Sequence, residues 1–224
     1  MPWRRPRLPA ITASLIALGL LASLTIAPAT AASVYTKDVY FEAGYERQVD
    51  SRTCTAASTA MILNFVARRD LKLDQLAILR YAQPRDALVD SQQRGTDPLG
   101  WSKALTYYSP KAGKGTIKYR WEAYTSEYAA LKRAAKQLAS MGRASGLLVQ
   151  NGKHAMVMTG FEASRNPLEG EFQLLAVWVS DPLGSKHRRY IPSESPLNKY
   201  LELDATSEYD KAWYGKYVIV APYT

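Results

Sequence analysis

The sequence predicts one α+β domain, with a helical part first along the chain and an antiparallel sheet second. Before residue 110, apolar residues recur at helical spacing in several segments. From residue 116 onward they gather in short runs typical of strands, interrupted by one amphipathic helix. Because the strands do not alternate with helices one by one, this order favours an α+β fold over a series of βαβ units.

The N-terminus has the pattern of a secretory signal peptide. MPWRRPR is basic, an apolar run follows from about residue 11 to 26, and Ala29-Thr30-Ala31 is a small-x-small cleavage site. The run is short of the roughly 20 apolar residues that a membrane-spanning helix needs. We therefore expect a signal peptide over residues 1–31, one secreted domain over 32–224 and no integral membrane segment after processing. A retained anchor and export by the twin-arginine route both stay open.

Composition narrows the possible partners. The net charge of +9 is scattered, and its densest patch is Lys186-His187-Arg188-Arg189. We interpret that patch as a solvated loop rather than a site for an anionic polymer, and without a nucleic-acid motif we expect no nucleic-acid partner. The single cysteine, Cys54, excludes an intramolecular disulfide, so stability must come from the core. We expect a monomer.

Three helices are expected in the first half of the chain. Residues 35–49 form an extended lead-in, and a helix begins at Cys54, capped by Ser51 or Thr53, with an inward stripe at Ala57, Met61, Ile62 and Phe65. A second helix runs from Asp74, its cap, to Tyr81. The segment SQQRGTDPLG (91–100) reads as a loop because of its Gly and Pro residues, and a short helix follows from Trp101 to Tyr108.

The second half alternates strands with one helix. TIKYRWEAY (116–124) predicts a strand and residues 126–141 an amphipathic helix. Next, Asn151-Gly152 separates the apolar runs GLLVQ and KHAMVMTGF, which is a strong hairpin signal because both turn residues accept a positive φ. FQLLAVWVS (172–180) and KYVIVAPY (216–223) predict two more strands.

Four residues in this arrangement could form a nucleophilic site. A helix start favours the thiolate of Cys54 and lowers the pKa of a thiol. His154 stands at the mouth of a strand, and Asp181 ends the next strand, where it could reach the far imidazole nitrogen. Gln48, six residues before Cys54, could donate to an oxyanion beside the Cys54 amide. The other histidine, His187, lies in the basic patch and makes a poor base.

In chain order these residues resemble the papain-like cysteine peptidases, and more closely the stand-alone relatives of the peptidase domain that removes double-glycine leaders in bacteriocin exporters. The matching segments are QVDSRTCTAASTAMIL (48–63), NGKHAMVMTGF (151–161) and VSDPL (179–183). The family often has Gly-Pro after the nucleophile, where this chain has Thr55-Ala56.

The resemblance, which spans roughly residues 36–224, implies a papain-like fold and a thiol hydrolase of peptide bonds without a cofactor. The roles it implies are Cys54 as nucleophile, His154 as general base and acid, Asp181 as its orienting residue and Gln48 as oxyanion donor. Two other functions stay open: a catalytically silent module that binds peptides or wall components, and a transferase that passes the acyl group to an amine.

Other readings of the same residues are less favoured. One cysteine and two separated histidines make no metal-ligand cluster, so no metal is expected. Cell-wall amidase families place Asp before the cysteine and Ser-Gly after it, unlike Thr53 and Thr55 here. We assign Met156 and Met158 to the core, and prefer core packing over a substrate groove for the aromatic residues Trp101, Tyr107, Tyr108, Trp121 and Trp178.

Overall fold

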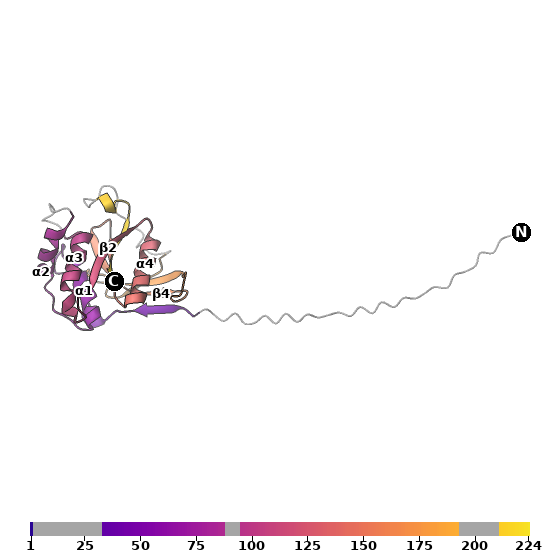
Figure 1. The fold of residues 1–224 in the computed structure, drawn as a ribbon, viewed down its shortest axis with the longest axis horizontal. Helices are drawn as coiled ribbons and strands as arrows, with labels where there is room; N and C mark the ends of the chain where they lie inside the picture. Colours follow the sequence, from indigo (N-terminus) through magenta and orange to yellow (C-terminus); the bar gives the residue numbers. More distant parts are fainter. Residues whose placement is uncertain (2–32, 88–94, 193–210) are drawn as a thin grey trace. The chain divides into compact units, whose positions relative to one another are not determined.

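The structure of the protein is a computed structural model that describes Met1 and residues 33–87, 95–192 and 211–224 (Figure 1). The predicted signal peptide, apart from Met1, and residues 91–94 of the predicted loop lie outside the described residues. Among the residues described, no helix is both long and apolar enough to span a membrane.

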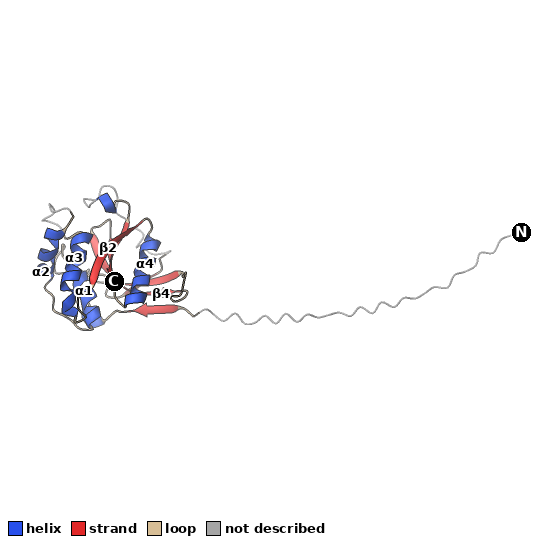
Figure 2. Cartoon of the chain, in the orientation of Figure 1, coloured by secondary structure: helices blue, strands red, loops and turns tan. Residues whose placement is uncertain are grey.

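The described residues fold into helices packed on one antiparallel sheet, which confirms the predicted α+β class (Figure 2). The α-helices are α1 (Cys54–Ala67), α2 (Gln75–Ala82), α3 (Pro98–Tyr108) and α4 (Glu127–Met141). The strands are β1 (Tyr35–Asp38), β2 (Lys118–Tyr124), β3 (Ser145–Val149), β4 (His154–Ala163), β5 (Leu174–Ser180), β6 (Arg188–Tyr190) and β7 (Tyr217–Tyr223). Their order is β2-β7-β3-β4-β5-β6, and β1 also pairs with β4.

The sheet has two more strands than the sequence indicates. The predicted lead-in contributes β1, which pairs with the second half of β4, and part of the basic patch forms β6, which pairs with β5. The prediction of a loop at residues 186–189 is therefore wrong for its second half. Both strands are short and mostly polar, so neither shows the apolar alternation from which a strand is predicted.

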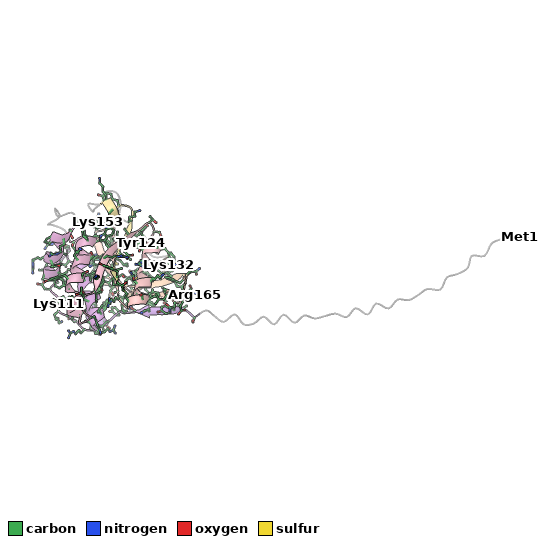
Figure 3. All side chains as sticks on the ribbon, in the orientation of Figure 1. Met1, Lys111, Tyr124, Lys132, Lys153 and Arg165 are labelled. Carbon is green, nitrogen blue, oxygen red and sulfur yellow. The ribbon has the colours of Figure 1, made fainter. Side chains whose placement is uncertain are left out.

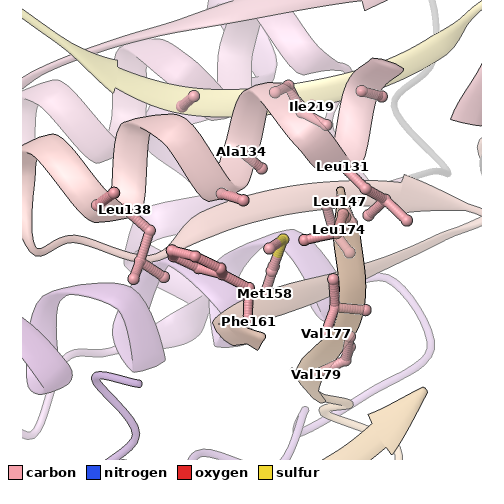
Figure 4. Close-up of a cluster of buried hydrophobic side chains, with 14 of the residues drawn as sticks. Leu131, Ala134, Leu138, Leu147, Met158, Phe161, Leu174, Val177, Val179 and Ile219 are labelled. Atoms are coloured by element: carbon pink, nitrogen blue, oxygen red, sulfur yellow. The ribbon is translucent and has the colours of Figure 1, made fainter. Parts of the chain in front are cut away.

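Helices cover both faces of the sheet. Because successive strand residues point to opposite faces, Met156 and Met158 of β4 pack in the cluster that includes α4, while Ala155 and Val157 pack with α1 and α3. Figure 4 shows Leu131 and Leu138 of α4 over Met158, Phe161 and Val177 of the sheet. The two methionines therefore belong to the core, as predicted.

The aromatic residues divide between core and surface. Trp101 is buried, and its indole N–H donates to Thr59 Oγ1 at 3.0 Å. Tyr107 is exposed and stacks on Tyr81, so the core expectation is wrong for Tyr107.

The hairpin before His154 is longer than a two-residue turn. Gln150, Asn151 and Gly152 all have a positive φ, of 54°, 53° and 81°. Gly152 N–H donates to Val149 O and Lys153 N–H to Gln150 O, both at 3.1 Å. The predicted turn residues are confirmed, but Gln150 and Lys153 lie in the turn instead of in the strands. The pairing of Val149 with His154 then fixes the histidine as the first residue of β4.

Helix α3 begins three residues before the predicted start, so Pro98 and Gly100 are helical rather than part of a loop. Asp97 caps it by accepting from Leu99 N–H and Gly100 N–H at 2.8 and 2.9 Å. Pro98 is tolerated because the first helical position needs no N–H donor. A Cβ at Gly100 would lie 2.7 Å from Ala82 O and closer still to Asp86 and Thr96. Close packing, rather than a turn, requires this glycine.

We predict that Gly100→Ala destabilises the fold by about 1–3 kcal/mol, because the added methyl overpacks the contact with Asp86. In an open helix the same change would stabilise by about 1 kcal/mol. Urea unfolding measures the difference. Lys103→Ala, at an exposed position of α3, is the control and should change stability by less than about 0.5 kcal/mol. A Gly100→Ala protein as stable as the parent would contradict the packing argument.

Candidate active site

The thiol of Cys54 stands at the N-terminus of α1, as the sequence predicts. Thr53 occupies the N-cap position, but its side chain forms no capping hydrogen bond, so the prediction that it caps the helix is wrong, and Ser51 does not hold the N-cap position. The Thr53 hydroxyl is instead used within the preceding loop, where it accepts from Val49 N–H and Asp50 N–H at 3.1 Å and donates to Asp50 O. The Thr53 hydroxyl therefore does not compete for the first amides of α1, which have no intrahelical acceptor.

Cys54 lies at the edge of the core rather than inside it. Its exposed fraction is 8%, whereas Ala57 and Met61 on the same helix are at 0%. Helix α1 is held on the sheet by contacts with β4, including Ser58 Oγ, which donates to Ala155 O at 3.4 Å. The residue after His154 therefore anchors the helix that carries the cysteine.

His154 and Asp181 form a hydrogen-bonded pair. His154 Nε2 lies 2.8 Å from Asp181 Oδ1, and the exposed side-chain fractions are 4% and 18%. The pairing of Val157 with Ser180 explains why the side chains of His154 and Asp181 lie close together. One residue beyond that pair, Asp181 is level with Met156, which puts it diagonally beside His154 on the same face of the sheet.

The turn after β5 holds the Asp181 side chain in place. Leu183 N–H donates to Asp181 Oδ1 at 2.8 Å, and Asp181 N–H donates to Ser185 O at 2.8 Å. Burial would raise the pKa of Asp181, but the hydrogen bonds from His154 and from Leu183 N–H outweigh it and lower the pKa below its usual value. The carboxylate is therefore ionised near neutral pH.

Both Cys54 and Asp181 act on His154. Burial alone would lower the pKa of His154, but the hydrogen bond to Asp181 and the interaction with the Cys54 side chain outweigh it and raise the pKa to about 9. Since Nε2 is bonded to Asp181, Nδ1 is the ring nitrogen left for the sulfur. The imidazole thus stands between a thiol and a carboxylate, with one nitrogen for each.

Gln48 is connected to the same turn through its backbone. Gln48 N–H donates to Pro182 O at 3.0 Å, and three residues earlier the Tyr45 hydroxyl donates to Asp181 O at 2.9 Å. One amide N–H of the Gln48 side chain donates to Asp50 O at 2.8 Å. These bonds tie the segment before Cys54 to the residue that faces His154.

The second histidine is engaged elsewhere. His187 Nε2 lies 2.8 Å from Asp38 Oδ2, and its ring stacks on Tyr40 with centroids 4.2 Å apart. Its neighbours Lys186 and Arg189 pair with Glu42 and Glu162. The basic patch is thus largely neutralised by acidic residues of the same chain.

The structure brings Cys54, His154 and Asp181 together and links Gln48 to them through Pro182. Two contributors, Tyr45 and Thr53, are not predicted as parts of the site from the sequence. Their roles depend on hydrogen bonds to backbone atoms, which leave no motif in the residue types. Within the described ranges, no three His, Cys, Asp or Glu side chains are grouped so as to hold a metal ion.

A comparison with known protein families matches a region that contains all four candidate residues, Gln48, Cys54, His154 and Asp181. Residues 40–208, more than half of the chain, match the model of the Peptidase_C39 like family. No curated protein matches the chain.

We predict that Asp181→Asn lowers the pKa of His154 from about 9 by roughly one unit or more, because the ionised partner of the imidazolium is removed. An NMR titration of the imidazole signals measures this shift. Asp38→Asn, which removes the partner of His187 instead, is the matched control and should leave the His154 titration unchanged. An unchanged His154 titration in Asp181→Asn would show that the pair does not govern its protonation.

Proposed function

The chain belongs to the C39-like peptidase family, which makes the protein a cysteine peptidase, and we propose that Cys54 is its nucleophile. We assign His154 as general base and acid, and Asp181 as the residue that orients it. The observation that carries this proposal is the position of His154, hydrogen-bonded to Asp181 and interacting with Cys54. Gln48 is assigned as a side-chain donor to the oxyanion.

In the first step the proton of the thiol moves to His154 Nδ1, and the sulfur attacks the carbonyl carbon of the scissile bond. The raised pKa of His154 favours this transfer, since the imidazolium is stabilised by the ionised Asp181. The start of α1 adds its dipole and unpaired amides beside the sulfur. The nucleophile is thereby activated without a metal or a cofactor.

Attack converts the carbonyl oxygen into an oxyanion, for which we assign two donors. One is the backbone N–H of Cys54, the first amide of α1, and the other is the Gln48 side chain. The bond from Gln48 to Asp50 O uses one N–H of the amide and leaves the second for the oxyanion. The same bond fixes the orientation of the amide.

The intermediate collapses when the imidazolium gives its proton to the leaving amine. The carbon–nitrogen bond breaks, the amine departs, and the acyl group remains on the sulfur as a thioester. Neutral His154 then removes a proton from water, which attacks the thioester and releases the acid and the thiol. A tightly held Asp181 keeps the ring in one orientation through both steps.

We further propose that this chemistry takes place outside the cytoplasm. The basis is the signal-like N-terminus and the single cysteine, since a protein with no other thiol cannot lose its nucleophile to an internal disulfide. A peptide or protein is the substrate implied by the family.

We predict that iodoacetamide labels native Cys54 at pH 6 at least about tenfold faster than the thiol of the denatured chain, because His154 stabilises the thiolate. The label is unambiguous since the chain has one cysteine. His154→Ala should reduce the rate to that of the denatured thiol. His187→Ala, which removes the other histidine, is the control. Equal rates in the parent and His154→Ala would refute the activation of Cys54.

We predict that Gln48→Ala lowers kcat by about 10²–10³-fold with little change in KM, because the donor acts on a charge that develops after binding. A peptide library read by mass spectrometry supplies the substrate, with Cys54→Ala as the inactive blank. Gln173→Ala, at an exposed position before β5, is the control for loss of a glutamine. An unchanged kcat in Gln48→Ala would remove Gln48 from the oxyanion site. Cleavage by Cys54→Ala would overturn the whole mechanism.

A further inference from the structure

A pocket lies at the far end of β5 from Asp181. It has a volume of about 490 Å³, within the range of about 300–1,000 Å³ typical of ligand pockets. It is formed where α4, β5 and β7 begin and where the chain leaves β6. The lining residues are Thr125, Ser126, Glu127, Tyr128, Leu174, Leu175, Ile191, Pro192 and Tyr217. Because β5 has seven residues, about 20 Å of strand separates this pocket from Asp181.

One charged side chain, Glu127, lines this mostly apolar pocket. The residue is 5% exposed, and its Oε1 is buried with no hydrogen-bond partner among the described residues. An unpaired carboxylate away from water costs free energy, and native structures rarely keep one without a purpose. The burial of this carboxylate therefore needs an explanation.

Neighbouring acidic residues show what Glu127 lacks. Glu122 pairs with Arg133 at 2.9 Å, and Glu171 pairs with Lys132 at 2.8 Å. Lys132 is labelled in Figure 3. Glu127 is also not required as a helix cap, because Ser126 Oγ caps α4 by accepting from Ala129 N–H at 3.2 Å. Among the residues that the structure describes, Glu127 has no cationic partner.

We propose that this pocket binds the side chain of a lysine or arginine from a bound peptide, with its cationic head on Glu127 and its methylene stem against Leu174, Ile191 and Tyr217. Long basic side chains combine an apolar stem with a charged head, as the pocket combines apolar walls with one carboxylate. This inference rests on the proposed peptidase function, since it adds a docking point on the substrate far from the scissile bond.

The charge of Glu127 gives the interaction a pH dependence. Burial raises the pKa of Glu127 to about 7, so the carboxylate form grows as the pH rises from 6 to 8. The other titratable groups among the described residues that line the pocket are the phenols of Tyr128 in α4 and Tyr217 in β7. Binding of a cation should therefore strengthen over this interval.

The experiment measures binding with catalysis blocked. Two peptides, acetyl-Phe-Lys-Leu-amide and its norleucine analogue, are titrated into full-length Cys54→Ala protein and followed by two-dimensional amide NMR. We expect the lysine peptide to shift the amides of Glu127, Leu175 and Ile191, with binding at least about tenfold tighter than the analogue at pH 8 and weaker at pH 6.

Glu127→Gln in the same background should reduce the affinity for the lysine peptide about tenfold and leave the analogue unaffected. The Glu127→Gln protein should also melt at a higher temperature than the Cys54→Ala protein at pH 8, which would show that it folds. Glu171→Gln, at an exposed carboxylate near the start of β5, is the matched control and should change neither affinity.

Equal binding of the two peptides would overturn the proposal. So would an affinity for the lysine peptide that is the same with and without the Glu127→Gln substitution. So would shifts confined to residues around His154, or equally tight binding of n-butylammonium. Because the measurement is made without the nucleophile, its failure would leave the assignment of Cys54 untouched, and a failed peptidase assay would not alter the binding result.

Discussion

The hydrogen bond between His154 Nε2 and Asp181 Oδ1 is the interaction on which the candidate site depends. It decides which ring nitrogen remains for the thiol, and it keeps a buried imidazole easily protonated despite the cost of burial. The antiparallel pairing of β4 with β5 makes the bond possible, because it brings the first residue of one strand beside the residue that follows the other. The register of β4 against β5 therefore determines whether His154 and Asp181 can pair.

The rest of the domain fixes the two groups that must meet this imidazole. The packing of α1 on β4 sets the distance of Cys54, since the same strand carries His154 and receives the Ser58 hydroxyl. The loop before α1 is bonded to the turn after β5 through Tyr45 and Gln48. The residues that we propose as nucleophile, base and oxyanion donor are therefore joined in one hydrogen-bonded frame. The Glu127 pocket lies at the other end of that frame, where a long peptide could be held while its scissile bond is presented to the sulfur.

Local signals made the main parts predictable from sequence. The start of α1 at Cys54 and the turn at Asn151-Gly152 follow from helical spacing and positive φ, and together they place the cysteine and the histidine. The sequence-based prediction fails where contacts distant in sequence decide. Gly100 is predicted as a loop residue, although it lies in α3, where its close contact with Asp86 leaves no room for a Cβ. The Thr53 hydroxyl accepts from Val49 N–H in the preceding loop, and no feature of the sequence indicates this bond. The pocket that Glu127 lines is formed by four separate segments of the chain, so no local pattern in the sequence could indicate it.

The proposed mechanism requires Cys54 to form a covalent acyl intermediate with the help of His154. Acid-quenched mass spectrometry of the protein reacting with p-nitrophenyl acetate tests it most directly. We expect a rapid burst with a single acetyl group on the peptide that contains Cys54, formed far more slowly in His154→Ala. Acetyl groups spread over lysines without a burst, or a burst that survives in Cys54→Ala, would contradict it.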